Sequence, residues 1–231
     1  MSVREAIASG RCRGFICAAA FRIEAIRKQL RVTYFTQPYM HVRHEIVTKA
    51  GHPHLKWSFG PDDSRHPRIH PKQAIKFQNA LRHGVLLMRG QNWMGLPSPP
   101  EIDEPSLYIT EEASERFQRE QRQLDVSALI DERGVGQSAF ANIGGRSGRP
   151  VRGANEKRLQ KACAEWADGE LVAAHIAYQN DVLCTDDRGR SAGRSILDDA
   201  NRKWLTAEHG VVFRSVDQLM DDLTKDAEGI R

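Results

Sequence analysis

The sequence predicts an α/β fold with three layers, in which helices flank a mainly parallel central sheet. Short apolar runs of β-forming residues alternate with segments of helical periodicity. These runs are "GFICAAA" (14–20), "VLCT" (182–185) and "VVF" (211–213). Each helix must run back before the next strand starts, so this alternation builds parallel sheets. With 231 residues, 40% of them hydrophobic, the chain is long enough to bury a sizeable core.

The first predicted core segment, residues 2–35, should form a helix, a strand and a second helix. Ser2 and Glu5 have the spacing of a capping box at the start of the first helix. The run 14–20 is compact and apolar enough for a buried strand. Apolar side chains then recur with helical spacing over residues 21–31.

A long insertion is expected in the middle of the chain, at about residues 36–152. Its first part, residues 36–71, is rich in His, Pro and Gly with little periodicity and should be mainly loop. Pro71 suits the first position of a helix, and "VLLM" is compatible with a short strand. A long acidic helix should follow, with Thr110 as its cap.

Charge is distributed unevenly along this insertion. From residue 41 to 90, nine Lys and Arg face three acids, whereas from 101 to 132 three Arg face ten acids. The asymmetry suggests one basic face for a phosphate backbone and one acidic helix for solvent or a partner. Solvated surface on both segments is the alternative.

The second predicted core segment, residues 154–224, has the most regular pattern of the chain. It alternates three apolar helical segments with two short strands, and Ser215 with Gln218 forms a capping box for a last helix. Asp168 is the expected N-cap of the helix that precedes the strand "VLCT", and Ser195 is a candidate N-cap for the helix after it. The whole chain, residues 1–231, is therefore expected to be a single domain.

Several carboxylates fall where these elements meet. Asp186 and Asp187 follow "VLCT", Asp168 and Glu170 begin the helix that returns to that strand, and Glu24 lies in the first turns of the helix after "GFICAAA". Strand ends and helix starts share one edge of a parallel sheet, where ligands usually bind. Clustered carboxylates repel one another unless a cation offsets their charge, and hard oxygen ligands suit Mg²⁺ or Mn²⁺. We therefore expect these five acids to form a metal site for phosphodiester hydrolysis.

Each acid also has a structural interpretation that needs no metal. Asp168 can simply cap its helix, and Glu24 can pair with Lys28 one turn later. Asp186 and Asp187 can be turn residues that lead the chain into solvent. Only the shared placement of the acids favours the metal site.

The stretch "WADGELVAAHIAYQNDVLCTDD" resembles the C-terminal core of PIN-domain nucleases. In that family an acid precedes an apolar helix, and the next strand ends in Thr-x-Asp. Asp168 or Glu170 matches the first position, and Thr185 with Asp187 matches the second. "GFICAAAFRIEAIRK" is similar to the family's second strand and the acidic helix after it, which assigns the family's early helix carboxylate to Glu24.

The resemblance covers roughly residues 2–31 and 155–224. It implies a Mg²⁺- or Mn²⁺-dependent ribonuclease, with catalytic acids at Glu24, Asp168 and Asp187. It also implies RNA as substrate, and an antitoxin or a second copy of the chain as partner, because the family is often the toxin of a toxin–antitoxin pair.

One part of the family pattern is missing. PIN domains begin with a strand that ends in a metal-binding aspartate, whereas this sequence starts at Ser2 within what would be a later helix. We therefore expect weak or no nuclease activity for the chain as given. The alternative is a non-catalytic PIN-like remnant that binds RNA or a protein partner through its basic middle segment.

The basic segment also offers candidate nucleic-acid contacts. Trp57 can stack on bases, and Lys56, Arg65 and Arg68 can contact phosphates, although all four can equally be loop residues. Four cysteines without a CxxC pair indicate reduced thiols rather than a disulfide framework or a zinc site. The sequence shows no signal peptide and no membrane span, which predicts a cytoplasmic protein without a membrane partner.

Overall fold

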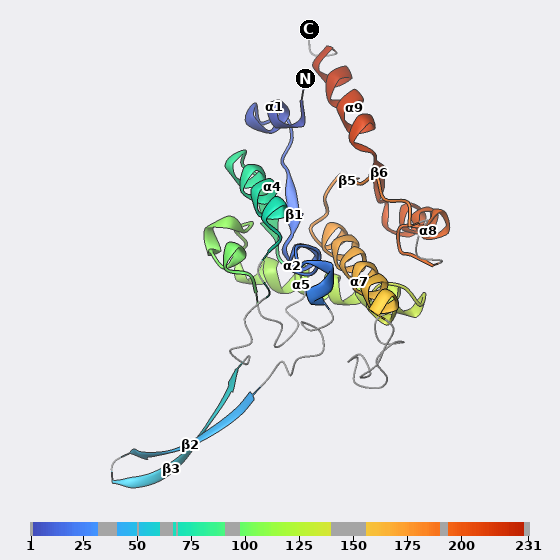
Figure 1. Ribbon diagram of the computed structural model, residues 1–231. Helices are drawn as coiled ribbons and strands as arrows, with labels where there is room; N and C mark the ends of the chain where they lie inside the picture. Colours follow the sequence, from blue (N-terminus) through green and yellow to red (C-terminus); the bar gives the residue numbers. More distant parts are fainter. Residues whose placement is uncertain are drawn as a thin grey trace.

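Helices and short strands alternate through most of the described chain (Figure 1). The computed structural model describes residues 2–31, 41–49, 51–60, 67, 69–90, 98–139, 156–189 and 194–228. Within these residues the protein is a mixed α/β fold with two parallel strand pairs and one antiparallel hairpin. The predicted α/β class is therefore confirmed.

The N-terminal segment comprises α1 (Val3–Ala8), β1 (Phe15–Cys17) and α2 (Ala18–Glu24). The predicted capping box is present: the Ser2 backbone N–H donates to the Glu5 carboxylate (2.7 Å), and the Glu5 N–H donates to the Ser2 hydroxyl (3.2 Å). Helix α2 starts earlier than predicted, because three consecutive alanines favour helix over strand. Glu24 is consequently the last residue of α2 and does not lie in its first turns, which corrects the prediction.

Strand β4 (Leu86–Met88) pairs in parallel with β1, so that Phe15 lies opposite Leu86 and Cys17 opposite Met88. Helix α4 (Pro71–Arg82) precedes β4, with Pro71 in its first turn as predicted. Its Phe77 stacks on Phe21 of α2, with ring centroids 4.1 Å apart. The short 3₁₀ helices η1 (Pro100–Ile102) and η2 (Pro105–Leu107) follow. Part of the predicted insertion thus supplies core structure.

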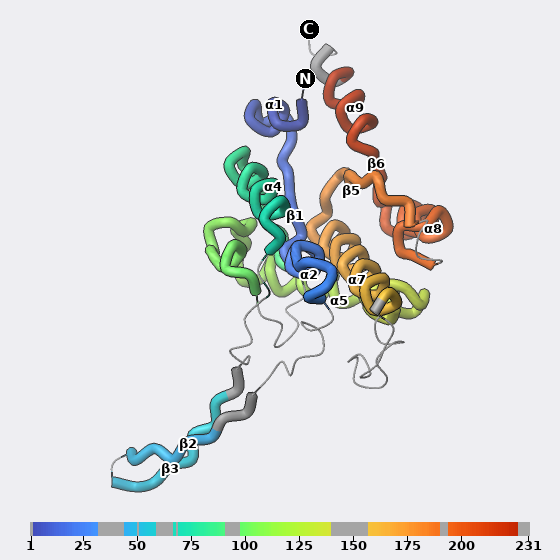
Figure 2. The backbone as a smooth tube through the Cα atoms, viewed as in Figure 1, coloured from blue at the N-terminus to red at the C-terminus, as the bar shows by residue number. Residues whose placement is uncertain are grey.

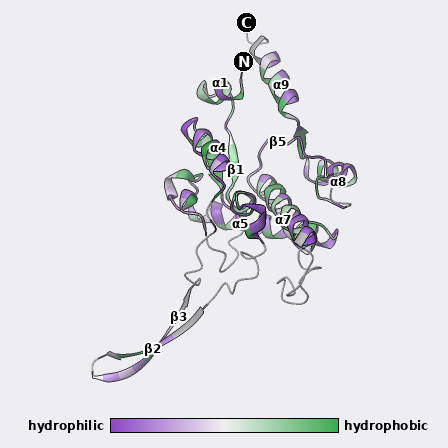
Figure 3. Ribbon diagram, viewed as in Figure 1, coloured by the Kyte–Doolittle hydropathy of each residue, from purple (hydrophilic) through white to green (hydrophobic). Residues whose placement is uncertain are grey.

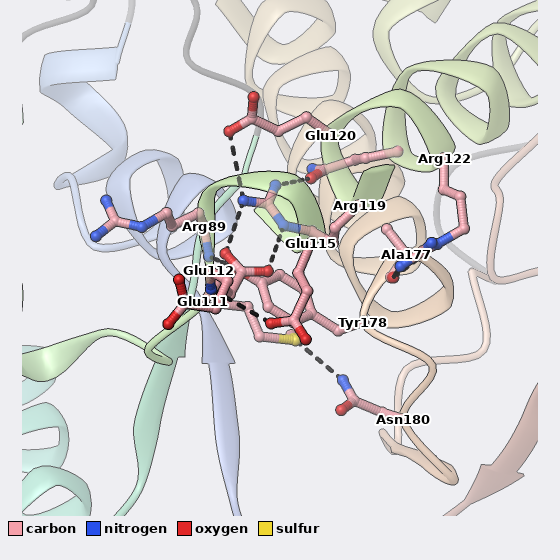
Figure 4. Close-up of polar contacts among 12 residues, drawn as sticks. Arg89, Glu111, Glu112, Glu115, Arg119, Glu120, Arg122, Ala177, Tyr178 and Asn180 are labelled. Atoms are coloured by element: carbon pink, nitrogen blue, oxygen red, sulfur yellow. Dashed lines mark hydrogen bonds and ion pairs between the residues drawn. The ribbon is translucent and has the colours of Figure 1, made fainter. Parts of the chain in front are cut away.

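The acidic helix α5 (Ala113–Glu132) packs against α7 (Glu156–Ala177). Its N-cap is Glu112 and not Thr110, because Glu111 leaves the helix start to pair with Arg119 (Figure 4). Both nitrogens in this bidentate contact lie 3.1 Å from the Glu111 oxygens, and the guanidinium lies over the Tyr178 ring at 4.9 Å. The Arg119 side chain is only 2% exposed, so this ion pair fixes the start of α5 inside the protein.

Helix α7 is one continuous helix where two were predicted. Leu159 and Trp166 of the first predicted half and Ala174 and Ala177 of the second are all buried and lie along one stripe of the helix. Gly169 in its middle is tolerated because the backbone of Gly136 approaches so closely that a Cβ at Gly169 would lie 2.9 Å from the Gly136 Cα. The prediction that Asp168 caps a helix is therefore wrong.

The C-terminal segment comprises β5 (Val182–Cys184), α8 (Asp199–His209), β6 (Val212–Arg214) and α9 (Val216–Glu228). Strands β5 and β6 pair in parallel. Asp198, not Ser195, caps α8, since its carboxylate accepts from the Asn201 backbone N–H at 2.8 Å. The predicted capping box of Ser215 and Gln218 is present at α9.

The prediction of loop over most of residues 36–71 is also wrong. Strands β2 (His41–Lys49) and β3 (His52–Gly60) form a long antiparallel hairpin that projects away from the helices (Figures 1 and 2). Gly51 adopts φ +81° at the turn, a conformation that glycine reaches without strain. In β3, apolar residues recur at every second position at Leu55, Trp57 and Phe59, a strand pattern that the abundance of His, Pro and Gly in residues 36–71 outweighed in the prediction.

Within the described chain the pairs β1–β4 and β5–β6 are separate two-stranded sheets. Helix α7 contributes to the cores of both. One apolar cluster joins α7 to α2 and β1, and another joins α7 to α5, α8 and β5. No helix among the described residues is long and apolar enough to span a membrane.

Candidate metal centre

The packing of α2 on α7 places Glu24 near Asp168. Small residues on α2, including Ala19 and Ala20, lie against the buried stripe of α7 and allow the helices a close approach. Arg31, itself buried, donates to the main-chain carbonyl of Glu24 at 2.9 Å and fixes the end of α2. Glu24 and Asp168, distant in sequence, therefore come within electrostatic range of each other.

The turn after β5 places Asp187. Its backbone N–H donates to the Thr185 hydroxyl at 3.1 Å, and its carboxylate accepts from the Gly189 N–H at 2.8 Å. Gly189 adopts φ +62°, and a Cβ there would lie only 2.7 Å from the Ser195 Cβ. Arg202 donates to the Asp187 carbonyl. The Thr-x-Asp sequence thus builds a fixed turn with an exposed carboxylate.

The three acids Glu24, Asp168 and Asp187 interact electrostatically in every pair. Burial, followed by the negative charges of Glu24, Glu165 and Asp187, raises the pKa of Asp168 to about 8. The surrounding protein and the charge of Asp187 also raise the pKa of Glu24, while Arg31 lowers it. Glu24 is open to solvent on one side, so water screens part of this effect. Three segments of the chain therefore converge on one negatively charged region.

These three carboxylates are a donor set that suits Mg²⁺ or Mn²⁺. Among the described residues, no three His, Cys, Asp or Glu side chains form a group that could hold a metal ion. Mg²⁺ usually takes one or two carboxylates and keeps several waters, so it does not need such a closed cage. A cation here would also offset the repulsion that raises the pKa of Asp168.

The structure gives Glu170 and Asp186 different surroundings. Glu170 is 3% exposed and points about 160° away from Asp168 around α7, as two residues do in a helix. Its carbonyl accepts from the Cys17 thiol of β1 at 3.7 Å. Asp186 accepts from the Val216 backbone N–H at 3.3 Å, at the start of α9. Neither contact brings its carboxylate toward Asp168.

Glu165 is a member of the cluster that the sequence did not reveal. It lies one turn before Asp168, is 4% exposed, and accepts from the backbone N–H groups of Gly136 (3.3 Å) and Ile196 (2.6 Å). Burial raises its pKa. Glu165 therefore ties two loops to α7 beside Asp168. The Glu-x-x-Asp spacing on one helix face was its only signal.

Two exposed arginines lie on the segment that follows Asp187. Arg188 directly follows Asp187 and is exposed. Burial is the main cause that lowers the pKa of Arg202, and the positive charge of Arg188 lowers it further. Arg194 is also exposed and approaches the Gly134 turn. Exposed arginines beside carboxylates can contact a phosphate while the acids face the scissile bond.

The predicted nucleic-acid residues lie elsewhere. Lys56 and Trp57 are on the hairpin strand β3, where the Lys56 ammonium pairs with Glu45 at 3.0 Å and Trp57 lies against His44. Arg65 and Arg68 lie outside the described residues. No described contact joins Lys56 or Trp57 to Glu24, Asp168 or Asp187.

Comparison with known proteins identifies no relative. No protein-family model matches the chain, and no curated protein or solved structure matches it.

Proposed function

We propose that this chain is a PIN-like, metal-dependent endoribonuclease that hydrolyses RNA phosphodiester bonds, with weak activity in the chain as given. The observation that supports this proposal is the mutual electrostatic coupling of Glu24, Asp168 and Asp187, which come from three separate segments. These acids would hold Mg²⁺ or Mn²⁺. When bound, such an ion supplies an activated water and stabilises charge on the phosphate.

The residues around the ion have separate roles in this proposal. Asp168, with its raised pKa, would hold the ion as a carboxylate and would have to lose its proton to do so. Glu165 positions the loops that border Asp168, and Arg188 and Arg194 bind the RNA backbone. The fold would then be a three-layer PIN-like domain, in which the β1–β4 and β5–β6 pairs belong to one central sheet. An antitoxin is the corresponding protein partner.

The proposal is tested by measuring cleavage of a fluorescent single-stranded RNA with Mn²⁺ in wild type and in Asp187→Asn. Asparagine keeps the acceptor for the Gly189 N–H but removes the charge, so the fold should be retained and cleavage lost. Asp181→Asn is the matched control, because Asp181 is an exposed acid at the other end of β5. Equal cleavage by wild type and Asp187→Asn would contradict the assignment.

A non-catalytic PIN-like remnant that binds RNA or a protein is the second candidate function. The observation that favours it is the separation of the two parallel strand pairs among the described residues. Thermal unfolding distinguishes the candidates, because only a competent site gains stability from Mn²⁺. An unfolding temperature unchanged by Mn²⁺, together with RNA binding without cleavage, would favour the remnant.

A further inference from the structure

The projecting hairpin has one apolar face that the described chain leaves in solvent. Directly opposed residues of an antiparallel pair share a face, as do alternate residues of each strand. Ile46 opposes Leu55, and His44 opposes Trp57. Ile46 is 73% exposed, and Leu55 and Trp57 are each 53% exposed. Figure 3 shows hydrophobic and hydrophilic residues together along these strands.

An isolated two-stranded hairpin is at best marginally stable in water. It becomes stable when its apolar face packs against another element, and contiguous exposed apolar patches of this kind mark interaction surfaces. We therefore expect another structural element to pack on the face of Ile46, Leu55 and Trp57.

Helix α5 carries a complementary surface. Phe117 (70% exposed), Leu124 (50%) and Ala128 recur at i, i+7 and i+11 and form an apolar stripe on one face. The opposite face is buried, with Arg119, Val126 and Ile130 packed against the protein. Helix α5 thus has apolar side chains on two sides, and within the described part of the chain only the side with Val126 and Ile130 is covered.

The two surfaces have opposite charge. The hairpin, residues 41–60, contains three Lys and Arg against one acid, with four histidines. The stripe on α5 is bordered by the exposed acids Glu120, Asp125 and Glu132. A basic arm with an apolar face thus matches an acidic helix with an apolar stripe, and both are present on every chain.

We infer that two copies of this chain form a reciprocal dimer in which the hairpin of each copy packs on the α5 stripe of the other. A two-fold arrangement uses both contacts in each dimer and closes the assembly. The inference is independent of the chemistry proposed for the carboxylates.

The inference is tested by sedimentation over a range of protein concentrations, after removal of nucleic acid. Trp57→Glu and Phe117→Glu should each raise the dimer dissociation constant by at least about tenfold. Both residues are exposed, so the variants should keep the wild-type circular dichroism. Ile75→Glu, at an apolar residue that is 60% exposed on α4, is the control and should leave the dimer unchanged.

Mixing the two variants gives the sharpest result. A heterodimer of Trp57→Glu and Phe117→Glu retains one unaltered hairpin on one unaltered stripe, so the mixture should dimerise more strongly than either variant alone. A hairpin-to-hairpin dimer would not respond to Phe117→Glu. That result, a monomeric wild type, or a dimer that disappears with the RNA would overturn the inference.

Discussion

Asp168 is the residue with the most unfavourable environment in the candidate site. It lies in the middle of α7, largely shielded from solvent, and three other acids raise its pKa. A helix that served only packing would gain stability from a neutral side chain at this position. Such acids are frequent at functional sites, because the charge that costs stability is the charge that binds a ligand.

The stability of the protein should therefore depend on pH through Asp168. Its pKa rises from 3.8 to about 8 on folding, so its contribution to stability is fully present below pH 3.8 and is lost as the pH rises through 8. Asparagine carries no charge at any of these pH values, so Asp168→Asn avoids the loss of stability at high pH. It should stabilise the metal-free protein at pH 9 by roughly 2 kcal/mol, after allowance for solvent screening. Urea unfolding at pH 5 and pH 9 measures the difference. An equal effect of Asp168→Asn at both pH values would contradict this assignment.

Glu165 should act through the loops that it holds. Glu165→Ala leaves the buried N–H groups of Gly136 and Ile196 without their acceptor and should cost about 2–4 kcal/mol in urea unfolding. Glu165→Gln keeps an acceptor oxygen and should cost much less. If both variants lost the same stability, the negative charge rather than the hydrogen bonds would be the important feature.

At the scale of elements, the capping boxes and the helix-starting proline predicted helix ends more accurately than the periodicity of apolar residues did. The capping boxes at Ser2 and Ser215 and the proline at Pro71 were predicted correctly, because their geometry depends on neighbouring residues only. The continuity of α7 depends on the backbone of Gly136 from another segment. No local pattern contains that contact, so the sequence suggested a helix start at Asp168.

The ion pair of Arg119 and Glu111 shows how α5 is attached to the core (Figure 4). Glu111→Leu removes the bidentate partner of the buried guanidinium and leaves it only the longer contacts to Gln123 (3.3 Å) and Glu120 (3.4 Å), so it should destabilise the protein by about 3 kcal/mol. The double variant Glu111→Leu, Arg119→Met replaces both charges with apolar groups and should recover most of that loss. Guanidinium denaturation of the two variants tests this, and a double variant less stable than the single one would contradict it.

At the scale of the whole molecule, the fold depends on α7. This helix carries Glu165 and Asp168, contributes to two apolar cores and leads directly into β5. The convergence of Glu24, Asp168 and Asp187 was predicted from the expectation that they share one sheet edge. The structure instead brings Glu24 and Asp168 together by helix packing, and Asp187 by the turn after β5. The electrostatic coupling of these acids therefore arises from an arrangement that differs from the predicted sheet edge, and their role as metal ligands stays a prediction.

The most direct test of the metal centre is the binding of Mn²⁺ measured by electron paramagnetic resonance, which distinguishes free from bound ion. The account predicts saturable Mn²⁺ binding by the wild-type chain, competition by Mg²⁺, and at least about a tenfold loss of affinity in both Asp168→Asn and Asp187→Asn. Asp181→Asn should bind as the wild type does. Absence of binding by the wild type, or undiminished binding by both variants, would contradict the claim that these acids share one ion.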